Sequence, residues 1–151
     1  MHELSRLRLS RITTRHAKLT AEGQRDAESD AAFLAGFARA RDEVLRPVME
    51  EVGAQLESAG YGFRISLGGT DGSPSVDFHI VIPNRGASKD TIRFFAHKDE
   101  GRGWQVIGEI ELKRSPVELT RFEATEPVTR ERAEQLIVDA VEQMFASTEG
   151  R

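Results

Sequence analysis

Between Tyr61 and Leu112 the chain alternates apolar and polar residues in short runs, and clusters of turn-forming residues separate these runs. This alternation constrains the fold more than any other feature, because the side chains of a strand point in turn to its two faces. We therefore predict strands at about residues 61–67, 76–82, 91–97 and 104–112, and a fifth at 117–124. Short turns favour antiparallel pairing of consecutive strands, so these strands should form a meander.

The segments on either side of the strands have apolar residues at helical spacing. Residues 26–58 carry one broad apolar stripe with Pro47 in its middle, which predicts a helix that is kinked or split there. Gly60 follows as the expected left-handed cap. A second stripe runs from Thr129 to Phe145 and predicts a C-terminal helix. The predicted fold is therefore α+β, with a helix, an antiparallel meander sheet of four to five strands and a C-terminal helix. Both helices should cover one sheet face, because each has a single stripe to bury.

Length and charge suggest how the chain is divided. The 151 residues fit one domain, which we place at residues 26–148, with a frayed tail at 149–151. The net charge of −4 is unevenly distributed. Residues 1–25 hold six basic and two acidic residues, a net charge of +4, whereas the rest holds 15 basic and 23 acidic residues, a net charge of −8. Residues 1–25 are therefore a basic N-terminal arm.

The basic arm has two interpretations. Its cations could contact nucleic acid phosphates or an acidic lipid surface, and the residues concerned are Arg6, Arg8, Arg11, Arg15 and Lys18. Alternatively, the arm is a frayed terminus attracted to the acidic body of its own chain or of a second copy. We favour the second interpretation, because the arm has no aromatic residue to stack on bases. Its apolar residues also fit neither a helical nor a strand period.

Composition excludes several classes of site. Cysteine is absent, which rules out disulfides, thiolate nucleophiles and cysteine-bound zinc. No apolar run approaches the roughly 20 residues that a membrane span requires. The first ten residues also lack the apolar core of a secretory signal. We therefore expect a cytoplasmic protein that does not bind membranes and has no cofactor.

Residues out of phase with the apolar set give the sheet a second face, which we call the outer face. Matching the apolar positions across the hairpins gives three expected pairs: Val76 with Leu67, Phe78 with Ala96, and Phe94 with Val106. The outer face then has three rows across the strands. They are Ser66, Asp77 and His97; Arg64, His79, Phe95 and Gln105; and Val81, Arg93, Ile107 and Phe122.

The polar cluster of Asp77, His79 and His97 could bind a metal ion or a small ligand, or support catalysis. A triad with Ser66 fails, because histidine must lie between the hydroxyl and the carboxylate, and here Asp77 would lie there. The cluster also lacks closely spaced metal ligands, so we expect solvated histidines and a cross-strand Asp77–His97 pair. The glycine-rich residues 68–73 match no phosphate-binding pattern and predict a long hairpin loop.

An apolar patch with a charged rim is the remaining feature of the outer face, and such a composition is typical of partner-binding surfaces. The patch comprises Val81, Phe95, Ile107 and Phe122, with Arg64 and Arg93 at its rim. The arm of the same chain, a second copy or a foreign protein could cover it. We expect a non-catalytic protein-binding or adaptor module that is homodimeric and uses this face. Nucleic acid binding through the arm, and ligand or metal binding or catalysis at the polar cluster, stay open as alternatives.

The order helix, meander, helix is similar to that of frataxin-like domains and some secretion chaperones. This resemblance concerns the order of elements alone and implies no function.

Overall fold

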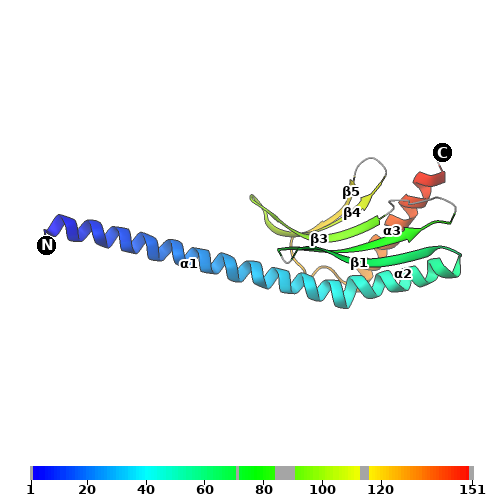
Figure 1. Ribbon diagram of the computed structural model, residues 1–151, viewed down its shortest axis with the longest axis horizontal. Coiled ribbons are helices and arrows are strands. Elements are labelled where there is room, and N and C mark those ends of the chain that lie inside the picture. The colour runs from blue at the N-terminus through cyan, green and yellow to red at the C-terminus, as the bar shows by residue number, and fades with distance from the viewer. Residues whose placement is uncertain (1, 71, 84–90, 113–115, 150–151) are drawn as a thin grey trace. The chain divides into compact units, whose positions relative to one another are not determined.

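The computed structural model describes residues 2–70, 72–83, 91–112 and 116–149 (Figure 1). Its helical elements are α1 (Glu3–Ala40), the π-helical turn η1 (Arg41–Leu45), α2 (Arg46–Ser58) and α3 (Arg130–Glu149). The strands are β1 (Gly62–Thr70), β2 (Ser73–Val81), β3 (Thr91–Asp99), β4 (Gly103–Glu111) and β5 (Pro116–Phe122). The fold is thus of the predicted α+β class. Most of the turns expected at residues 83–90 and 113–116, and residues 150–151 of the tail expected at 149–151, lie outside the described residues.

The chain divides into two compact units, residues 1–32 and residues 33–151. The first unit is helical from Glu3 onward, whereas its sequence showed no regular period. Residues 3–32 contain no proline and a single glycine, and they are rich in alanine, leucine, arginine and glutamate, which favour helices intrinsically. No apolar stripe indicated this helix in the sequence, because residues 2–29 bury no side chain. None of the described helices is long and apolar enough to span a membrane.

The helix predicted at residues 26–58 is interrupted just before Pro47, which lies in the first turn of α2. The chain stays helical through η1 into α2, and the N–H of Arg46 donates to the carbonyl of Arg41. Pro47 has no N–H, so it leaves a carbonyl of the preceding turn without a helical donor. The π-helical turn η1 directly precedes α2. The far end of α2 is also as predicted. Gly60 has a φ of 95°, and its N–H donates to the carbonyl of Glu57.

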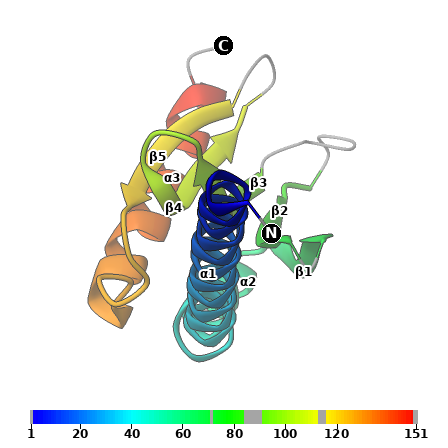
Figure 2. The ribbon, with the colours of Figure 1, turned by 90° about the vertical axis from the view of Figure 1, so that its left-hand side faces the viewer.

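The five strands form one antiparallel sheet in the order β1-β2-β3-β4-β5, which can be followed across Figure 2. The predicted fifth strand is present. Within the second unit, α2, α3 and the end of α1 contribute to the same core as the apolar phase of the strands. The largest fully buried side chains include Phe37, Met49, Phe78, Phe94 and Ile137. The helices therefore cover one face of the sheet, as predicted, and leave the outer face uncovered by them.

The register agrees with the prediction for the first hairpin only. Leu67 lies opposite Val76, as expected. Phe78 lies opposite Ile92, a shift of four residues from the expected Ala96. Likewise, Phe94 pairs with Gly108 instead of Val106, a shift of two residues. Even shifts leave each side chain on its predicted face but change its neighbours across the strands.

A tight turn replaces the long loop expected at residues 68–73. Strands β1 and β2 continue into this cluster until Thr70 lies opposite Ser73. Gly69 has a φ of 78°, and a Cβ there would lie 2.0 Å from the carbonyl oxygen of Ser73. Only glycine fits this position, because the backbone conformation and the close approach both exclude a side chain.

A β-bulge moves Phe122 from its predicted place on the outer face into the core. The register between β4 and β5 shifts between Gly108 and Glu109. Glu109 lies opposite Glu118, but Val106 lies opposite Phe122, so β5 contributes one extra residue. A shift of one residue turns the rest of a strand over. The outer-face placement of Phe122 was therefore wrong, and its ring packs in the core cluster.

Candidate functional site

An ion pair crosses the middle of the outer face, where Asp77 lies opposite Arg93. The guanidinium donates from Nε and Nη2 to the two carboxylate oxygens at 2.9 and 3.1 Å, and its Nη1 lies 3.9 Å from Glu109. The hydrogen bonds to Asp77 raise the pKa of Arg93. The Asp77 side chain is only 11% exposed. The expected Asp77–His97 pair is thus replaced by a bidentate, partly buried Asp77–Arg93 pair.

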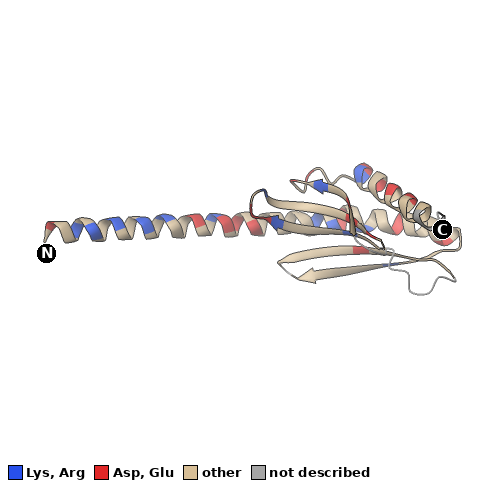
Figure 3. Ribbon diagram, turned by 90° about the horizontal axis from the view of Figure 1, so that it is seen from above, with Lys and Arg blue, Asp and Glu red and all other residues tan. Residues whose placement is uncertain are grey.

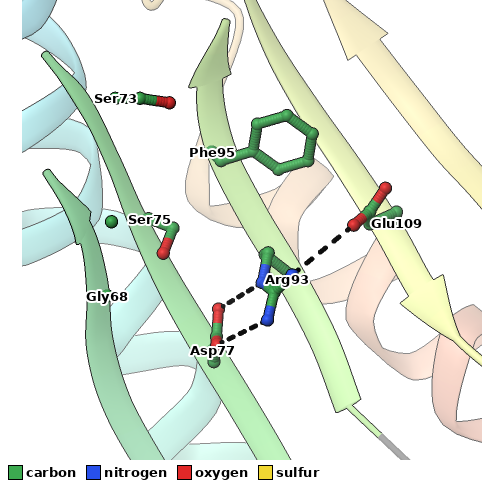
Figure 4. A pocket seen from close by; sticks show the side chains of 8 residues that line it. Gly68, Ser73, Ser75, Asp77, Arg93, Phe95 and Glu109 are labelled. Carbon is green, nitrogen blue, oxygen red and sulfur yellow. Dashed lines mark hydrogen bonds and ion pairs between the residues drawn. The ribbon is translucent and has the colours of Figure 1, made fainter. Parts of the chain in front are cut away.

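A hollow of about 480 Å³ lies beside this ion pair (Figure 4). Four strands line it: Gly68 and Gly69 of β1, Ser73, Ser75 and Asp77 of β2, Arg93 and Phe95 of β3, and Glu109 of β4. Its charged groups are two carboxylates and one guanidinium, a formal net charge of −1. We call this site the hollow. It combines one aromatic ring, two hydroxyls and an ion pair on the face of the sheet.

Small residues form the wall of the hollow on the side of β1. Gly68 lies opposite Ser75, and a Cβ at Gly68 would lie 2.9 Å from the Ser75 Oγ. The Ser73 Oγ donates to the carbonyl of Ala96 at 3.1 Å and joins the turn to β3. These residues were not predicted as part of a site, because residues 68–75 were expected to form a loop. The signal was available, since Ser75 and Ser73 share the phase of Asp77 along β2.

His79 lies on the same face between two hydroxyl groups. Its Nε2 is 2.9 Å from the Ser66 Oγ and its Nδ1 is 3.0 Å from the Thr91 Oγ1. Burial, followed by the positive charge of Arg64, lowers the pKa of His79 and favours the neutral imidazole. A nucleophilic triad needs a carboxylate on the nitrogen that faces away from the serine. Thr91 occupies that position, so this arrangement lacks the group that stabilises an imidazolium.

Each of the three residues of the predicted polar cluster has a different environment. Asp77 binds Arg93, His79 binds hydroxyls, and His97 is exposed, opposite Gln105. The His97 ring meets that of Phe95 edge to face, with centroids 6.4 Å apart. Within the part of the chain that the structure describes, no three histidine or acidic side chains are grouped so that they could hold a metal ion.

Gln105 is the most deeply buried polar residue of the outer face, with no exposed surface. Its Oε1 accepts a hydrogen bond from Arg121, which also binds Glu118. Its Nε2 has no partner among the described residues. Gln105 was predicted on the outer face, where a glutamine is usually exposed. Its burial results from the neighbours that the observed register brings together.

The predicted apolar patch is only partly assembled. Phe95 is half-buried in the hollow and lies opposite Ile107, which is buried on the outer face. Val81 is exposed at the far end of β2, opposite Gly62. Arg64 is exposed on β1. Phe95 and Ile107 therefore form the apolar centre, with Val81 away from it and Phe122 on the other face.

The basic residues of the first unit form a stripe. Arg8, Arg11, Arg15 and Lys18 follow one another at intervals of three, four and three residues, so they lie along one face of α1. All four are exposed, and Figure 3 shows the basic residues in succession along this part of the helix. Arg6, the remaining predicted nucleic acid contact, lies off this face.

Comparison with known proteins adds no relationship: no family model matches the chain, and neither a curated protein nor a solved structure is significantly similar to it.

Proposed function

We propose that the chain is a non-catalytic protein-binding or adaptor module, homodimeric, whose outer face holds a segment of a partner protein. The observation that carries this proposal is the position of Phe95, half-buried in an open hollow beside the buried Ile107. An apolar centre within a polar rim is the composition of protein interfaces. Aromatic side chains in such centres contribute much of the binding energy.

The polar groups of the hollow, and His79 next to it on the outer face, support binding more than catalysis. Asp77 and Arg93 are bound to each other, and His79 is bound to Ser66 and Thr91. A general acid or base must be within reach of a substrate proton. These side chains instead stiffen the sheet and hold the hollow in a fixed shape, which lowers the entropy lost when a partner binds.

The charge of the hollow favours a basic partner segment. The Glu109 carboxylate lies 3.9 Å from Arg93, so this contact is looser than the Asp77–Arg93 pair. A lysine or arginine of the partner could pair with Glu109 and stack on the Phe95 ring, because aromatic faces attract cations. A partner segment with a basic residue next to an apolar residue fits the site.

A peptide-display selection tests this proposal. We expect random peptides selected on the wild-type protein to be enriched in basic and apolar residues, and their binding to be lost in Phe95→Asp. Val138→Asp is the matched control, because Val138 is 47% exposed on α3 and distant in the fold from the outer face. Binding would be measured by fluorescence polarisation with a labelled selected peptide. Equal binding to both variants, or no enrichment, would refute the proposal.

A second candidate function, nucleic acid binding, is favoured by the basic stripe of α1. Four exposed cations on one helical face can follow a phosphate backbone. If they do, the affinity for a short DNA duplex should fall with salt, with a slope of log K against log salt near −0.9 per contacted phosphate. Arg11→Gln should reduce this slope by about 0.9, whereas the matched Arg6→Gln should not. A slope unchanged by Arg11→Gln would argue against this function.

A further inference from the structure

The two edges of the sheet differ in how well they are protected against pairing with another strand. Among the described strands, β1 and β5 are the edges. β5 is seven residues long, begins with Pro116, carries Glu118 and Arg121, and contains the bulge. Charges, proline and bulges are the usual devices that prevent edge-to-edge association. β1 is nine residues long and has one charge, Arg64, with no proline and a regular register.

The apolar phase of β1 is only partly covered by its own chain. Phe63 stacks on Phe78 with ring centroids 5.8 Å apart and lies against Gly53 of α2, where a Cβ would meet its ring. Ile65 is half-buried. Leu67, two residues further along the same face, is 50% exposed. Burial of the apolar side chains therefore decreases along β1, and Leu67 is left exposed beside the unprotected edge.

We propose that β1 pairs with β1 of a second copy, antiparallel and with the two-fold axis at Ile65, to form a continuous ten-stranded sheet. The apolar phase of the strand is self-complementary in this register, because Leu67 lies opposite the partner's Phe63 and Ile65 opposite the partner's Ile65. Arg64 then faces the partner's Ser66 across the strands.

Other registers are less favourable. An axis at Arg64 would place two like charges directly opposite each other, which destabilises a strand pair. An axis at Ser66 would pair Leu67 with the partner's Ile65, a smaller side chain than Phe63. The occupant of this edge is thus a second copy, since the strand supplies its own complement. This inference rests on the proposed homodimer but not on the hollow.

Light scattering gives the first test. The wild-type chain should have twice its mass of 16.8 kDa, and Leu67→Lys should reduce the mass to that of a monomer. Val138→Lys, which adds the same charge at a similarly exposed apolar residue of α3, should remain dimeric. A monomeric wild type, or a dimeric Leu67→Lys, would overturn the proposal.

Cross-linking gives a second test that does not depend on a destabilising variant. The chain has no cysteine, so single cysteines can be placed freely. Residues opposite each other in an antiparallel pair have Cα atoms about 4.5–5.5 Å apart, within the range of a disulfide. Arg64→Cys mixed with Ser66→Cys should therefore form a covalent dimer under mild oxidation, and neither variant alone should. A dimer from Ser66→Cys alone would overturn the register, and no cross-link in the mixture would overturn the interface.

These outcomes are independent of the peptide-binding experiment. A wild-type chain that is monomeric, or a Leu67→Lys variant that stays dimeric, would refute the edge interface alone if the selected peptides still bind. Loss of peptide binding in Phe95→Asp with a retained dimer leaves the edge interface intact.

Discussion

The Asp77–Arg93 pair should contribute measurably to stability, and Arg93→Met tests this while keeping the aliphatic part of the side chain. Breaking a buried ion pair costs about 3–5 kcal/mol, whereas exposed pairs contribute about 0.2–1 kcal/mol. The Asp77 side chain is 11% exposed and that of Arg93 is 38% exposed, so the pair lies between these limits. We expect Arg93→Met to lower the free energy of unfolding by about 2 kcal/mol, because Asp77 loses a bidentate partner in a partly buried site.

A double-mutant cycle separates the pair from other effects of the substitution. Asp77→Asn, Arg93→Met and the double variant would be unfolded in urea at one protein concentration and followed by the fluorescence of Trp104, the only tryptophan. We expect a coupling free energy of about 1–2 kcal/mol. The Arg46–Glu50 pair of α2 is the control, since both side chains are about half exposed and should show much weaker coupling. A coupling for Asp77–Arg93 no larger than that of the control would refute the reasoning.

Four further predictions concern single residues. The pKa of His79 is lowered in the folded state, so the unfolded state binds a proton more readily. The free energy of unfolding should therefore fall as the pH drops below about 6.5. His79→Gln should reduce this pH dependence, measured by urea unfolding at pH 7 and pH 5. Gly108→Ala should lower the free energy of unfolding by about 1–3 kcal/mol, because its Cβ would lie 2.7 Å from the ring of Phe94. Gly23→Ala, with no neighbour within 4 Å, should instead increase the helicity of α1 in circular dichroism. Gln105→Leu removes a buried amide donor that has no partner among the described residues, but it also removes the oxygen that accepts from Arg121. Because Arg121 keeps its hydrogen bonds to Glu118, we expect these two effects to offset each other and the free energy of unfolding to change by less than about 1 kcal/mol. A larger loss in urea unfolding would show that the hydrogen bonds of Gln105 outweigh the cost of its unpaired amide.

The sequence predicted which face of the sheet each side chain occupies more reliably than which residues lie side by side. Side chains of a strand alternate with a period of two, so the apolar phase of each strand, which includes Phe78 in β2 and Phe94 in β3, was expected to face the core whatever the size of an even register shift. Their neighbours depend on the turns, and the β2–β3 connection gives no signal for its register. The shift of four residues between β2 and β3 therefore replaced His97 with Arg93 opposite Asp77 and changed the chemistry expected of the site.

The long helix was underestimated for a different reason. Its residues favour helix locally, yet the search relied on a buried apolar stripe, and residues 2–29 bury nothing. Recognising the spacing of Arg8, Arg11, Arg15 and Lys18 would have indicated a helical face from charge instead of from apolar residues.

By itself, the sequence determined the α+β class, the order of the elements and the two faces of the sheet, because these follow from local periodicity, proline and glycine. Tertiary structure decided the candidate site. One extra residue in β5 moved Phe122 into the core. The tight turn after Thr70 placed Ser75 opposite Gly68, and the register between β2 and β3 placed Phe95 opposite Ser75 and Arg93 opposite Asp77. Such pairings depend on contacts between segments far apart in the chain, whose energies no local pattern records.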